Sequence, residues 1–190
     1  LGHTINNLNI NRSTSDNVGL FGYASGATIR NVGMVGGSVS GRLYVGSLVG
    51  QNAGFGIISN AYATGSVSGN TSVGVLVGGN RGTISNAYAA GSVSGIFEVG
   101  GLVGINSGGS ISNAHATGSV SGNSGVGGLV GRNSSGAINN SYATGSVNGG
   151  GVYIGGLVGD SSGAINNAYA AGNVSGNGSY VGGLVGYNVG

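Results

Sequence analysis

Apolar positions recur along the chain in units of 26–28 residues. Three short segments return in each unit: a Leu-Val-Gly triplet, an Ile-x-Asn triplet and a Gly-x-Val-x-Gly segment, which in one unit occupy 102–104, 111–113 and 118–122. Regular self-similarity at this period is typical of solenoid proteins, in which each unit forms one coil, here called a rung. The rungs begin near Asn17, Val45, Val73, Val99, Val126, Ile154 and Val181.

The recurring segments predict strands. Each is too short for a helix and is flanked by Gly, Asn or Ser, which favour turns, whereas Val and Ile favour strands. In the stretch "AYATGSVSG" (61–69), the character of the side chains alternates with period two. This alternation assigns Ala63, Gly65 and Val67 to an inner face, and Tyr62, Thr64, Ser66 and Ser68 to an outer face.

A single rung is not expected to be stable alone. Burying its four aliphatic side chains contributes roughly 1.5–3 kcal/mol each, whereas ordering its backbone costs on the order of 1 kcal/mol for every residue. Stacking lets each strand pair with its copies above and below. We therefore predict an all-β fold, a parallel β-solenoid (β-helix) of about seven rungs with three short strands per rung, as one domain over 1–190 with half rungs at both ends. Leu102, Val103, Ile111 and Val120 should point inward.

One asparagine recurs after the isoleucine of each rung. Identical Asn side chains stacked at a corner can form an amide ladder, and Asn also tolerates the left-handed backbone that a corner requires. We therefore predict a structural Asn ladder. Its members are Asn7, Asn31, Asn60, Asn86, Asn113, Asn140 and Asn167.

The outer face carries an aromatic column beside columns of hydroxyl side chains. Its aromatic members are Tyr62, Tyr88, His115, Tyr142 and Tyr169. Such a column could stack to stabilise the solenoid, or it could bind sugar rings or a host surface together with the neighbouring Thr and Ser residues. Ice binding is disfavoured, because the threonine column is interrupted by Ala90 and Ala171.

Composition narrows the function. Only 4% of residues are charged, against roughly 25% in typical domains, yet 39% are hydrophobic, which argues against disorder. The net charge of +2 comes from scattered arginines, so no nucleic-acid partner is expected. No apolar run approaches the ~20 residues of a membrane span. The absence of cysteine is compatible with secretion and excludes disulfides.

Catalytic chemistry is not indicated. The acidic residues Asp16, Glu98 and Asp160 fall in different rungs, and His3 lies about four rungs from His115. The sequence therefore predicts no catalytic residues, no metal site and no cofactor, and we expect a protein that is not an enzyme.

The stretch "VGGLVGINSGGSISNAHATGSVSG" (99–122) resembles the GLUG motif repeat, and the resemblance covers nearly the whole chain. The first copy departs from it, because "NVGMVGGSVSG" (31–41) contains one extra residue before Gly37. Such repeats occur in large secreted bacterial surface proteins, including adhesin-like proteins and some immunoglobulin A-cleaving peptidases. The resemblance therefore implies an extracellular, bacterial-type stalk or adhesive array. It implies no catalytic residues, because the peptidase chemistry lies outside such repeats.

Both ends of the sequence fall within a rung, with Ile5 and Leu8 near one end and Leu184 and Val185 near the other. Two explanations are open: the chain is a window from a longer array, or copies stack head to tail into a fibre. We therefore expect a structural segment of an extracellular bacterial fibre or adhesin stalk, whose partners are further copies or neighbouring repeats. The alternative is a carbohydrate- or host-surface-binding module that uses the Tyr, Thr and Ser face.

Overall fold

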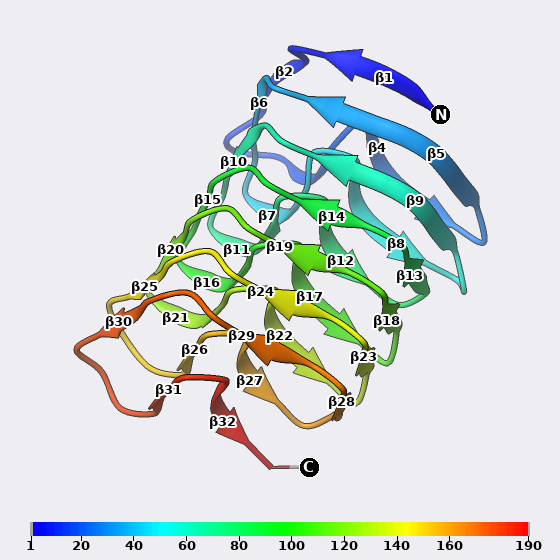
Figure 1. The fold of residues 1–190 in the computed structure, drawn as a ribbon. Coiled ribbons are helices and arrows are strands. Elements are labelled where there is room, and N and C mark those ends of the chain that lie inside the picture. The colour runs from blue at the N-terminus through cyan, green and yellow to red at the C-terminus, as the bar shows by residue number, and fades with distance from the viewer. Residues whose placement is uncertain (1, 190) are drawn as a thin grey trace.

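The structure is a computed structural model that describes residues 2–189. These residues form 32 short strands and no helix, wound into a stack of coils with the two termini at opposite ends (Figure 1). The prediction of a parallel β-solenoid of about seven rungs is confirmed. The three predicted segments contribute strands in each rung, and two further short strands, one before the Leu-Val-Gly triplet and one at the Tyr-Ala pair, complete it.

Equivalent strands of successive rungs form four sheets, and all their pairings are parallel. The 11-stranded sheet A contains β1 (His3–Asn6), β5 (Thr28–Val35), β9 (Ile57–Ala63), β13 (Thr83–Ser85), β14 (Tyr88–Ala89), β18 (Ser110–Ser112), β19 (His115–Ala116), β23 (Ala137–Asn139), β24 (Tyr142–Ala143), β28 (Ala164–Asn166) and β29 (Tyr169–Ala170). The 7-stranded sheet B contains β2 (Asn9–Asn11), β6 (Ser38–Ser40), β10 (Ser66–Ser68), β15 (Val93–Ser94), β20 (Val120–Gly122), β25 (Val147–Gly149) and β30 (Val174–Gly176).

The remaining two sheets also have seven strands each. Sheet C contains β3 (Asp16–Val18), β7 (Leu43–Val45), β11 (Thr71–Gly74), β16 (Phe97–Gly100), β21 (Ser124–Gly127), β26 (Ile154–Gly155) and β31 (Val181–Gly182). Sheet D contains β4 (Phe21–Ser25), β8 (Val49–Ala53), β12 (Val77–Asn80), β17 (Val103–Ser107), β22 (Val130–Ser134), β27 (Val158–Ser161) and β32 (Val185–Asn188).

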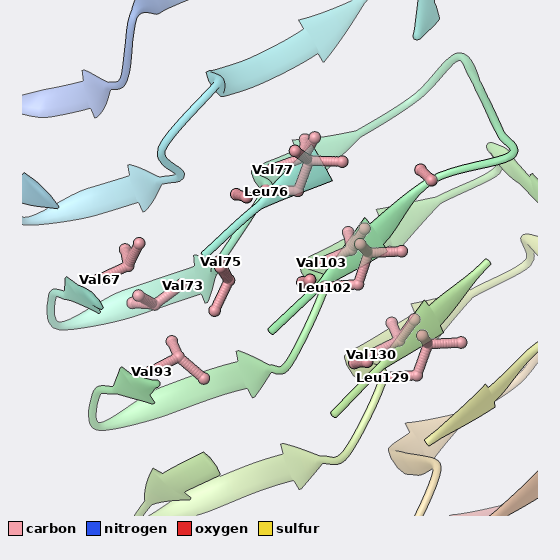
Figure 2. Packing of buried hydrophobic residues seen from close by; sticks show 14 of the residues in the cluster. Val67, Val73, Val75, Leu76, Val77, Val93, Leu102, Val103, Leu129 and Val130 are labelled. Atoms are coloured by element: carbon pink, nitrogen blue, oxygen red, sulfur yellow. The ribbon is translucent and has the colours of Figure 1, made fainter. Parts of the chain in front are cut away.

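The core is a set of aliphatic columns that run along the solenoid. Leu76, Leu102 and Leu129 take the same place in three successive rungs, each beside a valine of sheet D, and all point inward (Figure 2). The predicted inward residues Leu102, Val103, Ile111 and Val120 are buried, so their assignment is confirmed. Because the register pairs identical residues, each rung buries its apolar side chains against copies of themselves.

The first rung is registered differently from the prediction. Strand β1 pairs with the second half of β5, so Ile5 lies beside Met34 and the chain enters the solenoid after the position of the Ile-x-Asn triplet. Asn7 therefore lies outside the predicted asparagine column, and its backbone N–H donates to the carbonyl of Val35 (2.8 Å) at the next corner. Leu1 lies outside the described residues. The extra residue before Gly37 is accommodated by left-handed conformations at Gly36 and Gly37 (φ 64° and 75°).

A glycine precedes the sheet B strand in every rung from Gly65 to Gly172, because successive backbones approach closely there. A Cβ on Gly118 would collide with the carbonyl oxygen of Gly91 in the preceding rung. The neighbouring Ser119 points to solvent. The corner therefore tolerates a side chain at Ser119 but not at Gly118.

Gly118→Ala should consequently lower the free energy of unfolding by about 3 kcal/mol, since rungs must separate to admit the methyl group. Ser119→Ala, which removes an exposed hydroxyl one residue away, should change it by less than about 0.5 kcal/mol. Urea unfolding followed by circular dichroism measures both. Equal effects would show that the close approach at this corner does not constrain the fold.

Candidate functional site

The predicted asparagine column exists from Asn31 to Asn167, but it does not form an amide ladder. All six side chains are exposed, and among residues 2–189 one bond joins two of them, from Asn60 Nδ2 to Asn31 Oδ1 (3.2 Å). The prediction of a ladder at this column was therefore wrong, because the side chains leave the corner toward water. The backbone explains the residue choice: φ lies between 49° and 57° at Asn31, Asn60, Asn86, Asn113, Asn140 and Asn167, the left-handed region that Asn tolerates well.

A buried ladder lies at a different asparagine, two residues after the Leu-Val-Gly triplet. Asn52 Nδ2 donates to Asn80 Oδ1 (2.8 Å), Asn80 to Asn106 (2.8 Å), and Asn106 to Asn133 (2.9 Å). Asn133 Nδ2 then approaches Ser161 Oγ (3.4 Å). All four asparagine side chains are buried, so these bonds satisfy groups that water cannot reach.

The same amides close the turn from sheet D to sheet A. The Nδ2 atoms of Asn52, Asn80, Asn106 and Asn133 also donate to the carbonyls of Gly56, Gly82, Gly109 and Gly136, at 3.0–3.2 Å. At the N-terminal end of the column, Ala24 takes the asparagine position and offers no donor, which leaves Asn52 Oδ1 buried without a partner. Each amide therefore joins its own turn to the next rung.

Asn106→Ala should lower the free energy of unfolding by about 2 kcal/mol or more, because the Asn80 amide loses its acceptor and Asn133 Oδ1 loses its donor inside the core. Asn113→Gly is the matched control: it removes an exposed amide of the same type and keeps the left-handed corner. We expect it to be nearly neutral in the same urea experiment. A neutral Asn106→Ala would contradict a structural role for the buried ladder.

The predicted aromatic column is a continuous stack on the outer face of sheet A. Successive rings from Tyr62 through Tyr88, His115 and Tyr142 to Tyr169 have centroids 4.9–5.2 Å apart and planes within 7° of parallel. This separation matches the ~4.8 Å distance between strands, so rings and backbones share one repeat. The stacked faces leave no room for a sugar ring between them, which favours a stabilising role for the column.

His115 occupies the middle of this stack. Its ring lies between those of Tyr88 and Tyr142, and partial burial lowers the pKa of His115 from 6.5. An unfolded chain therefore binds a proton on this imidazole at a pH where the folded chain does not. The neutral His115 side chain therefore contributes to the free energy of unfolding. This contribution is fully present above the ordinary pKa and is lost as the pH falls through the lowered pKa of the folded state.

We predict that the protein unfolds at a lower urea concentration at about pH 5 than at about pH 8, and that His115→Tyr reduces this difference. The substitution removes the titrating group and supplies the ring that the other four positions of the column carry. Urea midpoints of both proteins at the two pH values measure the effect. An identical pH difference in both proteins would assign it to other groups.

The predicted assembly residues lie at opposite ends of the solenoid. Ile5 and Leu8 are half-buried in the first rung, Val185 is half-buried in the last, and Leu184 is 41% exposed. Leu184 continues the column of Leu157, whereas Ile5 continues the column of Met34 and Ala63 on sheet A. Leu184 and Ile5 therefore belong to different columns, so they would not meet if one copy stacked on the end of another.

Catalytic groups do not gather in the described part of the chain. No three His, Asp or Glu side chains of residues 2–189 lie close enough to hold a metal ion together. Residues 2–189 likewise contain no helix long and apolar enough to cross a membrane. The charged residues that do meet are Asp16 with Arg42 (2.7 Å), and Arg132 with Glu98 (3.5 Å) and Asp160 (3.2 Å).

Both the repeat motif and the fold are similar to those of known proteins. The family model of the GLUG motif matches residues 41–68, 96–121 and 122–148, which confirms the predicted resemblance. The fold is similar to a crystal structure of a putative immunoglobulin A1 protease from Bacteroides ovatus, with a TM-score of 0.72 and 28% sequence identity over 92% of this chain. The chain spans 60% of the length of that structure. The comparison with curated proteins gives no match.

Proposed function

Because the chain carries GLUG motif repeats that stack as a β-solenoid, we propose that it is a structural segment of a secreted bacterial surface fibre or adhesin stalk. The observation that carries this proposal is the uniformity of the rungs. The same aliphatic columns, the buried Asn ladder and the aromatic stack extend through most of the length, so the molecule is a rod held together along its axis. All three features stabilise the stacking of the rungs. We propose that the repeats have no catalytic activity of their own.

A location outside the bacterial cell fits the likeness to a protein described as an immunoglobulin A1 protease, since immunoglobulin A1 is itself an extracellular protein. The composition fits as well: with 4% charged residues and no cysteine, stability comes from strand pairing and not from ion pairs or disulfides. A rod of this kind can hold a binding or catalytic domain away from the cell surface.

The ends of the solenoid support axial association with another copy. The last strand of each sheet has a partner on one side only, and beside these edges Tyr169, Val181 and Leu184 are 54%, 43% and 41% exposed. Open strand edges with apolar side chains favour pairing with another chain. Low charge leaves little electrostatic repulsion to oppose it.

We propose that two copies continue the register of the rungs, which gives a junction other than the pairing predicted from sequence. Continuing each sheet across the junction places β32 beside the partner's β4, so Leu184 and Val185 approach Leu20 and Phe21 rather than Ile5 and Leu8. Ile5 would then lie beside Ala170, in the column that it already begins.

Electron microscopy and light scattering of the purified chain test the proposal, and we expect rods that lengthen with protein concentration. Leu184→Asp should abolish the lengthening, because a carboxylate in the junction would be buried without a partner. Thr117→Asp adds the same charge on the exposed side of a central rung and should leave assembly unchanged. Rods of unchanged length in Leu184→Asp, or a monomer at every concentration, would contradict end-to-end assembly.

A further inference from the structure

The uniformity of the rungs breaks down on one face, at the corner between sheets C and D. Two columns meet there, and in each the residue type varies along the stack. The corner column, whose members all have positive φ, contains Asn17, Tyr44, Ser72, Glu98, Gly125, Tyr153 and Tyr180. The sheet D column contains Tyr23, Gln51, Gly79, Ile105, Arg132, Asp160 and Tyr187. Two of the chain's three acidic residues and one of its five arginines are in these columns.

A hollow of about 390 Å³ opens in this face where the corner column has a glycine. Gly125 has no side chain, while the rungs on either side place Glu98 and Tyr153 at the same position. We call this hollow the notch. Glu98 and Tyr153 are two strand spacings apart, so the notch is about 9.6 Å wide along the solenoid axis. This width admits one ring at the place where Gly125 lacks a side chain.

Aromatic side chains form both ends of the notch. Phe97 is 47% exposed at one end, and Tyr153 forms the other. The Tyr153 ring packs on Tyr180 (centroids 5.4 Å apart) and Tyr187 (5.0 Å) on its C-terminal side. Tyr153 itself lines the notch. The wall is thus held in place before any ligand arrives.

Charged groups line the side of the notch. Arg132 lies between two carboxylates, with Nε 3.2 Å from Asp160 Oδ2 and Nη1 3.5 Å from Glu98 Oε1. Glu98 Oε2 also accepts a hydrogen bond from Ser72 Oγ, which fixes that carboxylate. Within residues 2–189, Arg132 Nη2 and Asp160 Oδ1 have no hydrogen-bond partner. Both residues line the notch, so its lining includes a donor and an acceptor that the protein leaves without a partner.

We propose that the notch binds a neutral pyranose ring. The C–H faces of such a ring pack on aromatic side chains, and its adjacent hydroxyls both donate and accept, which matches Asp160 and Arg132. Two carboxylates around one guanidinium leave a net charge of −1, so an acidic sugar is repelled. A planar apolar ring would fill the space but leave the polar pair without partners. This site is separate from the aromatic column, and it does not depend on whether the rod is a stalk.

Methyl pyranosides of glucose, galactose, mannose and N-acetylglucosamine are suitable probes, with the methyl glycoside of glucuronic acid as the acidic counterpart. In heteronuclear NMR titrations of the full chain, at least one neutral glycoside should shift the amide resonances of Phe97, Gly125 and Tyr153. The acidic glycoside should not. Shifts with the acidic glycoside alone, or with none of the neutral ones, would overturn the proposal.

Ser124→Phe fills the notch, because Ser124 lies in register with Phe97 and lines the notch in the rung of Gly125. This variant should lose the ligand-induced shifts. Ser124 Oγ also accepts a hydrogen bond from the Val152 N–H (3.2 Å), so Ser124→Ala, which removes this bond without filling the notch, should keep the ligand-induced shifts. Thr71→Phe is the matched control, since it places the same ring one rung beyond Phe97 and leaves the notch open. Retained binding in Ser124→Phe, or equal loss in Thr71→Phe, would overturn the assignment; resonances of rungs distant from 124 report whether each variant is folded.

Discussion

The structure depends on parallel backbone pairing between successive rungs. Strand pairing fixes their separation at ~4.8 Å and places equivalent residues directly above one another. A residue type that tolerates contact with a copy of itself at this distance can therefore recur in every rung and form a column along the solenoid. Leucine and valine do so in the interior, asparagine amides do so in a buried turn, and tyrosine rings do so on the outer face. Charged residues do not, which accounts for their scarcity in the repeat.

The sequence predicted the core well because its signal is simple. The repeat shows which positions are equivalent, and the alternation around Val120 shows which of them point inward. Choosing between two asparagine columns needed more than alternation. From Val103, strict period two would place Ile105 inside and Asn106 outside, whereas the structure buries Asn106 and leaves Ile105 half-buried in the outer column. The bend lies just before the strand, at residues 101–102, so the inward set follows Leu102, Gly104 and Asn106, and Val103 is buried out of phase with it.

The notch and the first-rung register were beyond prediction for another reason. The register of β1 depends on which half of β5 it pairs with, and the short first rung fits either half by composition. The notch depends on residues that do not repeat: Glu98, Arg132 and Asp160 come from three different rungs and meet through the stacking of sheets C and D. A repeat analysis treats such residues as departures, although in the structure they form the most varied surface of the molecule.

The hydrogen bonds between rungs run along the solenoid axis, and this direction determines how the rod responds to mechanical force. A pull on the terminal strand acts on the outermost interface, where hydrogen bonds open one after another, so the end rung can peel away while the other rungs stay paired. Each released rung contributes only ~4.8 Å to the folded rod. Its 26–28 residues reach about 90 Å once extended. A pulled rod would therefore lengthen in steps and limit the force that reaches whatever is attached to its ends.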